Sequence, residues 1–152
     1  MKQTIQELKI LEASLHVICT KARGFSKNPL GTTIAFFAWH PKVNEFLRVI
    51  GDPEGLVYNV SERITTMGDF AAQSVAQEVD LSLVEDEPTL ITDPVKMCRV
   101  LADDLLIASE QARKIGSIAA PQADLGTMGV VVPVTFQLEH WGAEFRRMTG
   151  KP

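Results

Sequence analysis

The chain has 152 residues and a net charge of −4, with 45% apolar and 22% charged residues. This composition excludes extended disorder, and the length suits a domain that holds its core without disulfides or a structural metal. We therefore expect residues 1–152 to form a single domain. The acidic balance also argues against tight DNA binding, because nonspecific affinity for DNA comes from cations that displace counterions at phosphates.

Two cysteines, Cys19 and Cys98, fall within apolar helical patterns, and neither has the spacing of a metal or redox motif. We expect buried thiols in a reducing compartment. Residues 1–7 lack the apolar core of a signal peptide, and no stretch has the roughly 18 consecutive apolar residues of a membrane span. The sequence thus predicts a cytoplasmic protein with no membrane association.

Residues 3–23 predict a first amphipathic helix, because apolar residues recur there at three- and four-residue steps with mostly charged residues between them. The apolar residues are Ile5, Leu8, Leu11, Leu15, Ile18 and Ala22. We expect this helix to end near Gly24, ahead of the turn-forming residues 28–31.

A shorter helix is predicted for residues 40–50, within an apolar stretch that begins at Phe36. Pro41 suits its first turn, where a missing amide proton costs no hydrogen bond. Gly51 should end this helix. The next residues, Asp52-Pro53-Glu54, offer a cap, a first-turn proline and an acidic residue for the start of another helix.

The second long helix is predicted to run from there to about residue 78, with Gly68 as a weak point that a helix tolerates. Its apolar stripe consists of Val57, Val60, Ile64, Met67, Ala71 and Val75. Residues 79–93 are rich in acidic and turn-forming residues and predict a long crossover with room for one helical turn. The apolar residues expected to pack this crossover against the other helices are Leu81, Leu83 and Val84.

Two further long helices are predicted after the crossover. Asp93 and Pro94 cap and start the third, which should end near Gly116. The fourth begins at Leu125, and Pro133 predicts a kink within it.

The β-branched residues 130–135 leave a short strand open as an alternative. A lone strand would lack a second strand to pair with, so the whole pattern favours an all-α four-helix bundle. This bundle has a short extra helix near residues 40–50 and a long crossover near residues 79–93.

An ordinary di-iron centre inside such a bundle is not expected. That kind of centre takes a Glu from each of two helices and a Glu-x-x-His motif from each of the other two. No Glu-x-x-His occurs here, and the nearest spacing, from Gln137 to His140, has an amide in place of the carboxylate. No nucleophile elbow, phosphate-binding loop or zinc motif occurs either.

Three stretches, together with the four periodic segments, resemble the Dps branch of the ferritin-like proteins. They are Gly-Phe-Ser-Lys-Asn-Pro-Leu-Gly at 24–31, Phe-Phe-Ala-Trp-His-Pro-Lys-Val-Asn-Glu-Phe at 36–46 and Tyr-Asn-Val-Ser-Glu-Arg at 58–63. The resemblance implies a ferritin-like bundle whose subunits close into a hollow shell, a dodecamer built from dimers. It also implies storage of iron and protection of starved cells under stress.

In Dps proteins the iron-oxidising site lies between two subunits, and the resemblance implies which residues occupy its positions here. They are, in chain order, Ser26, His40, Asn44, Tyr58 and Glu62. The family has histidine at the first position and aspartate at the third and fourth. His40 and Glu62, with Asn44 and the adjacent Glu45, are thus the candidate ligands for iron.

The replaced ligands remove charge and metal affinity, so a ferroxidase site of normal strength is not expected. A second interpretation makes His40 a helix-capping or interface histidine and Glu62 the partner of Arg63 or of another chain. For His16 we expect a partly buried core or interface position.

Two functions stay open at this point. One is a Dps-like iron-storage shell with a weak ferroxidase site. The other is a catalytically inactive ferritin-like scaffold that shields DNA or binds a partner, although the acidic chain supports DNA binding only weakly.

Overall fold

The computed structural model describes residues 1–30, 36–51 and 55–150. These residues form six α-helices and one short 3-10 helix, and no strand occurs among them. The helices are α1 (Lys2–Lys27), α2 (Phe36–Ile50), α3 (Leu56–Thr66), α4 (Val75–Leu81), α5 (Pro94–Ala119) and α6 (Leu125–Arg147), with η1 (Ala120–Gln122) before α6. The all-α prediction is therefore confirmed.

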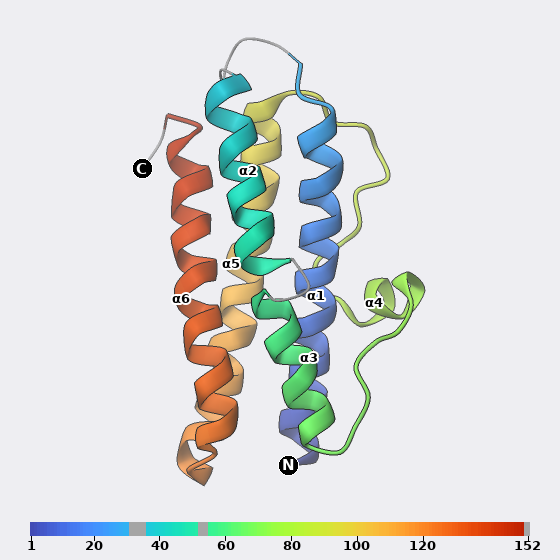
Figure 1. The fold of residues 1–152 in the computed structure, drawn as a ribbon, viewed down its shortest axis with the longest axis vertical. Coiled ribbons are helices and arrows are strands. Elements are labelled where there is room, and N and C mark those ends of the chain that lie inside the picture. The colour runs from blue at the N-terminus through green and yellow to red at the C-terminus, as the bar shows by residue number, and fades with distance from the viewer. Residues whose placement is uncertain (31–35, 52–54, 151–152) are drawn as a thin grey trace.

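Four long rods make up the bundle (Figure 1). Three are the single helices α1, α5 and α6, and α2 and α3 follow one another along the fourth. The short helix α4 lies outside these rods and packs mainly against α1. The helix α1 contacts α2, α3, α4 and α5, and so links most of the elements of the fold.

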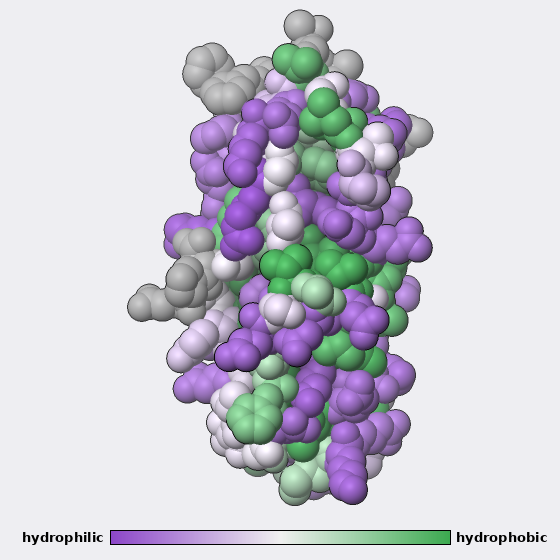
Figure 2. Space-filling model, turned by 90° about the vertical axis from the view of Figure 1, so that its right-hand side faces the viewer, coloured by the Kyte–Doolittle hydropathy of each residue, from purple (hydrophilic) through white to green (hydrophobic). Residues whose placement is uncertain are grey.

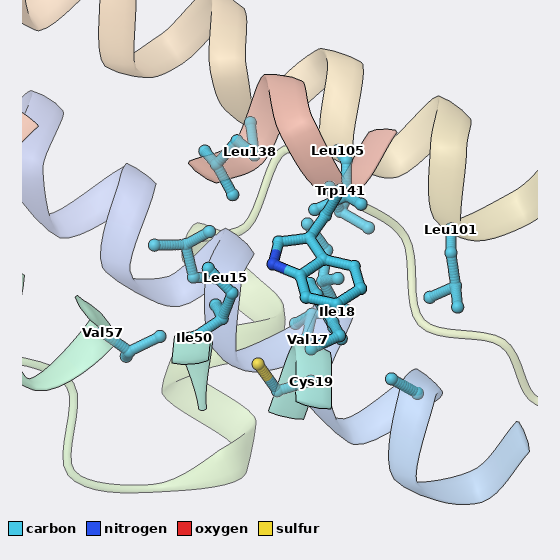
Figure 3. Close-up of a cluster of buried hydrophobic side chains, with 14 of the residues drawn as sticks. Leu15, Val17, Ile18, Cys19, Ile50, Val57, Leu101, Leu105, Leu138 and Trp141 are labelled. Carbon is cyan, nitrogen blue, oxygen red and sulfur yellow. The ribbon is translucent and has the colours of Figure 1, made fainter. Parts of the chain in front are cut away.

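The core forms from the apolar stripes that the sequence predicts. Leu8, Leu11, Leu15 and Ile18 are all fully buried, and Figure 3 shows part of this cluster around Trp141. Each such side chain contributes about 1.5–3 kcal/mol relative to an exposed position. The aromatic rings of Phe46, Trp141 and Phe145 pack in edge-to-face and tilted arrangements within it.

The first helix is longer than predicted, because it continues through Gly24 to Lys27. Phe25 is buried there, and this burial outweighs the cost of about 1 kcal/mol for a glycine within a helix. The side-chain amide of Asn28 donates to the carbonyl of Gly24 at 2.9 Å and satisfies one of the last carbonyls.

The second helix also begins earlier than predicted, at Phe36, so Pro41 lies inside it on the exposed side. It ends at Ile50 as expected, with Gly51 in the turn that follows. The predicted helix start at Asp52-Pro53-Glu54 lies outside the described residues.

The prediction of one helix up to residue 78 is wrong. The helix α3 ends at Thr66, and Gly68 adopts a φ of +90°, a left-handed conformation that glycine tolerates far better than other residues. Gly68 is therefore a break, where the sequence suggested a tolerated weak point. Val75, which the predicted stripe would bury, is exposed in the separate helix α4.

The crossover contains α4 and then an irregular segment up to Asp93. Of the three apolar residues expected to pack there, Val84 is buried, Leu81 is half-buried and Leu83 is exposed. The expectation of a long crossover with one short helix is confirmed, although the helix begins earlier than predicted.

The two C-terminal helices follow the prediction closely. The carboxylate of Asp93 accepts a hydrogen bond from the amide of Val95, and α5 runs past Gly116 to Ala119. The strand alternative for residues 130–135 is wrong, because these residues lie within α6. Pro133 lies inside α6, which is one helix from Leu125 to Arg147, and the kink predicted there stays a prediction. Figure 1 shows α6 as a continuous helix.

Buried polar groups on α1 are paired with the helices around it. The Lys21 ammonium lies 2.9 Å from an Asp104 carboxylate oxygen on α5, and both side chains are almost enclosed. Burial raises the pKa of Asp104, and the hydrogen bond from Lys21 opposes this shift. The pair fixes α1 against α5, since either charge left alone in this position would be costly.

Both cysteines are buried and neither forms a disulfide, as the sequence predicts. Burial raises the pKa of the Cys98 thiol to about 12.

None of the described helices combines the length and apolar character required to span a bilayer.

The start of α6 is tied to α3 by Arg63. One Asp124 oxygen accepts hydrogen bonds from the Thr127 amide at 3.0 Å and from the Arg63 guanidinium at 2.9 Å. The Thr127 hydroxyl donates to the other oxygen at 2.6 Å. Gly126 leaves the room that the guanidinium fills, because a Cβ at this position would lie 2.7 Å from it. Asp124 thus caps α6 and links two rods of the bundle.

Replacing this cap should destabilise the fold. We expect Asp124→Ala to lower the free energy of unfolding by about 1 kcal/mol, the usual cost of losing an N-cap acceptor. Asp124→Asn is the matched control, because its amide oxygen keeps the cap and loses only the charge that faces Arg63. Urea denaturation at about pH 7 measures both differences.

The ion pair between Asp124 and Arg63 can be tested by comparing the stability of the wild type and of Asp124→Asn as a function of pH. Burial raises the pKa of Asp124, but the bonds from Thr127 and the charge of Arg63 lower it below its ordinary value. The stability that this lowered pKa contributes is fully present above the pKa of Asp124 in the unfolded chain. It is lost as the pH falls through the pKa of Asp124 in the folded chain. The advantage of the wild type over Asp124→Asn should therefore shrink toward about pH 3, and a constant advantage would contradict the ion pair.

Candidate functional site

The predicted ligand His40 lies early in α2, one turn before Asn44. Its Nδ1 is 3.0 Å from the Asn44 side-chain nitrogen. Since an amide nitrogen can only donate, Nδ1 accepts this bond and the ring proton lies on Nε2. The neighbour of His40 is thus a neutral amide that occupies one of its two ring nitrogens.

Glu45 and Glu62 are both exposed. The hydrogen bonds that Glu62 accepts from Thr65 and Thr66 go to its backbone carbonyl and leave its carboxylate to solvent. The predicted alternative partner of Glu62, Arg63, directs its guanidinium at Asp124 and Thr127. Because α2 and α3 follow one another along the bundle, the fold does not bring His40 and Glu62 into one cluster within a chain (Figure 1).

Two more aligned positions hold residues that are poor ligands. The Ser26 hydroxyl donates to the carbonyl of Arg23 at 2.7 Å within α1. Tyr58 on α3 is 52% exposed. A hydroxyl engaged by its own helix and a neutral phenol replace an imidazole nitrogen and a carboxylate, which are much better metal ligands.

A different cluster does bring metal-binding side chains together: Glu12 and His16 on α1 with Glu78 on α4. One ligand atom from each lies within 4.8 Å of the other two, and this is the one such group of three found among the described residues. His16 Nε2 is 2.8 Å from Glu12 Oε1, and its Nδ1 is 3.8 Å from Glu78 Oε1. We call these three residues the α1–α4 cluster.

The three side chains of the cluster differ in their exposure to solvent, with Glu12 buried and His16 the most exposed. Glu12 is 1% exposed, whereas the side chains of Glu78 and His16 are 16% and 35% exposed. The Ser61 hydroxyl on α3 donates to Glu12 Oε1 at 3.3 Å. The other Glu12 oxygen, Oε2, is buried without a hydrogen-bond partner among the described residues. A buried carboxylate oxygen without a partner costs free energy, and a cation or a hydrogen-bond donor beside it would remove this cost.

The electrostatics of the cluster reflect one base between two acids. The hydrogen bond to Glu12 raises the pKa of His16 above its ordinary value, and burial opposes this shift. Burial raises the pKa of Glu78, and the charge of His16 opposes it. Arg23 also acts on both groups through its charge. Its guanidinium donates to the carbonyl of Gly51 at 3.1 Å.

The position of Glu78 depends on how α4 is held. Ser74 and Gln77 form a reciprocal capping box that starts this seven-residue helix. None of its residues is buried, so packing contributes little to its position. Beyond the helix, the amide of Leu83 donates to the Ser14 hydroxyl of α1 at 3.0 Å. Polar contacts therefore dock α4 on α1 at the level of the cluster.

Sequence reasoning did not identify this cluster. It predicted a partly buried core or interface position for His16, which is partly buried, and it did not single out Glu12 or Glu78. The i,i+4 spacing of Glu12 and His16 on a helix was a visible signal. Glu78 carried none, because it reaches α1 only when the chain turns back after Gly68.

The structure is similar to solved Dps proteins. With Dps from Vibrio cholerae O1, described as a member of a superfamily of ferritin-like diiron-carboxylate proteins, the TM-score is 0.86 at 22% identity over 96% of this chain and 88% of that one. For Dps from Staphylococcus aureus the TM-score is 0.86 at 19% identity, covering 98% and 96%. For Dps from Thermosynechococcus elongatus it is 0.88 at 14%, covering 99% and 92%.

At these identities the likeness shows the fold. No protein-family model and no curated protein matches this sequence. The predicted all-α bundle with a short extra helix and a long crossover is confirmed as the fold of Dps-like mini-ferritins.

Removing the Ser14 hydroxyl should loosen the segment that follows α4. We expect Ser14→Ala to lower the local stability of this segment by about 1 kcal/mol, which corresponds to roughly fivefold faster hydrogen exchange at the Leu83 amide. Ser117→Ala is the matched control, because that exposed hydroxyl donates only to its own helix, at Arg113. Equal exchange at Leu83 in both variants would show that Ser14 does not hold the segment.

Proposed function

We propose that this chain, which has the fold of the Dps-like mini-ferritins, is the subunit of a hollow homo-oligomeric shell that stores iron and protects the cell under stress. The observation that supports this most is the similarity over nearly the whole chain to separate Dps structures, with TM-scores of 0.86–0.88. The resemblance of the sequence motifs points to a dodecamer built from dimers.

Exposed apolar residues support an assembly of several copies. On α6, Leu125, Val132 and Phe136 are between 55% and 78% exposed. Their spacing of seven and four residues puts them on one side of the helix. On the face that bears α4, hydrophobic residues form patches among hydrophilic ones (Figure 2). Phe70, between α3 and α4, and Val75, at the start of α4, are also exposed. Surfaces of this kind are typical of contacts between subunits.

Iron would be the substrate and cargo of this shell. At the inter-subunit positions the chain offers His40 and Glu62 as charged or imidazole donors, with Asn44 and Glu45 beside His40. One imidazole and one carboxylate from the aligned set do not fit a full ferroxidase centre, which needs more anionic donors around the metal. We therefore assign to this chain iron storage with a degenerate, weak ferroxidase site.

The alternative is a ferritin-like scaffold without iron chemistry, which would bind a partner or shield DNA. The neutral Asn44 amide on His40 is the observation that favours it. The net charge of −4 argues against DNA as the partner. We place the protein in the cytoplasm, since two buried thiols without a disulfide suit a reducing compartment.

The assembly can be tested by mass. A closed dodecamer of 16.7-kDa chains should give a native mass of about 200 kDa by light scattering. Phe136→Glu should reduce this mass if the exposed α6 surface joins subunits, and Glu110→Gln on α5, another exposed position, should leave it unchanged. A wild-type mass of one or two chains would contradict the shell.

The iron chemistry can be tested by restoring the ligands. Wild-type protein loaded aerobically with ferrous iron should oxidise it at a rate close to the buffer control. The triple variant Ser26→His, Asn44→Asp, Tyr58→Asp should oxidise it at least about tenfold faster, because it regains an imidazole and two carboxylates. The matched control carries alanine at the same three positions. A triple variant no faster than this control would show that the loss is not one of ligands alone.

A further inference from the structure

We propose that the α1–α4 cluster of Glu12, His16 and Glu78 is a binding site for a divalent first-row transition metal ion, held within one subunit. It is distinct from the inter-subunit positions around His40 and Glu62, and it does not depend on the proposed iron storage.

The geometry is close to what such an ion requires. Ligand atoms on nitrogen and oxygen lie about 2.0–2.2 Å from Zn²⁺, so two ligands of one ion are at most about 4.4 Å apart. The three ligand atoms of the cluster already lie within 4.8 Å of one another. Side-chain adjustments that open the 2.8 Å contact between His16 Nε2 and Glu12 Oε1 and bring the carboxylate of Glu78 closer would let the three residues share one ion.

The buried end of the cluster carries the strongest argument for a ligand. Glu12 is 1% exposed, and its Oε2 has no hydrogen-bond partner among the described residues. A carboxylate in that position is costly unless a positive charge or several donors compensate it. Ser61 supplies one donor to the other oxygen, in the manner of the outer hydrogen bonds that orient metal ligands. A divalent cation would satisfy the remaining oxygen.

The open end of the cluster gives access. His16 is the most exposed of the three, so an ion can enter past its ring and keep water in the remaining coordination positions. Glu78 belongs to a short helix with no buried residue. Its carboxylate can therefore move toward the ion at little cost in packing. The two carboxylates together balance the charge of a divalent ion.

The donor set also indicates the class of metal. One imidazole nitrogen with two carboxylate oxygens suits Zn²⁺, Fe²⁺ or Mn²⁺. It offers too few oxygens for Ca²⁺, which takes six to eight, and no thiolate or thioether for Cu⁺.

The test is a calorimetric titration of the full-length protein with Zn²⁺, at one pH and in a buffer that does not bind metal. The wild type should bind one Zn²⁺ ion per chain. Glu78→Gln and His16→Ala should each lower the affinity for this ion by at least about tenfold. Asp80→Asn, an exposed acid on the same short helix, is the matched control and should bind as the wild type does. Glu78 is the preferred position, because its helix contributes no buried residue and the variant should fold.

A second double variant, His40→Ala with Glu62→Gln, separates this site from the proposed shell chemistry. It should retain the ion that Glu78→Gln loses, and crystals grown with Zn²⁺ should show anomalous density between Glu12, His16 and Glu78. Unchanged affinity in Glu78→Gln and His16→Ala, or no Zn²⁺ bound by the wild type, would overturn the site, and the cluster would then be an ion-paired contact only. Neither result would alter the mass or the iron oxidation rate on which the proposed function is judged.

Discussion

The enclosure of α1 is the constraint on which the rest of the structure depends. This helix contacts α2, α3, α4 and α5, and half of its residues are buried, polar ones among them. Buried polar groups need hydrogen-bond partners, and three of those on α1 find one outside α1. Lys21 pairs with Asp104 of α5, the Ser14 hydroxyl accepts from the Leu83 amide after α4, and Glu12 accepts from Ser61 of α3. These pairings set how the surrounding helices sit against α1.

The sequence predicted the fold well where one helix face decides the structure. The stripes from Leu8 to Ile18 and from Val57 to Ile64 are buried as expected, because burial of apolar area dominates the energy of such a face. It predicted badly where a single backbone angle decides. Gly68 is compatible with a helix interior and with a left-handed turn, and the choice between them depends on tertiary contacts that a local pattern does not contain.

Local sequence patterns also limited how much of a functional site could be predicted, because they do not contain contacts between distant segments or between subunits. The aligned positions of His40 and Glu62 could be found by motif, because each sits in a characteristic local stretch. Whether a second subunit brings them together is a property of the assembly and not of the chain. The α1–α4 cluster was half visible, since Glu12 and His16 share a helix face, but Glu78 joins them only through the turn at Gly68 and the docking of Leu83 on Ser14.

The burial of Cys98 has a consequence for the reactivity of its thiol. Because burial raises the pKa of this thiol to about 12, the sulfur stays protonated at neutral pH. The anion is the form that ligates soft metals and reacts with peroxides. Cys98 is thus kept inert by its apolar surroundings, and sulfenic acid formation there would first require the helices to open.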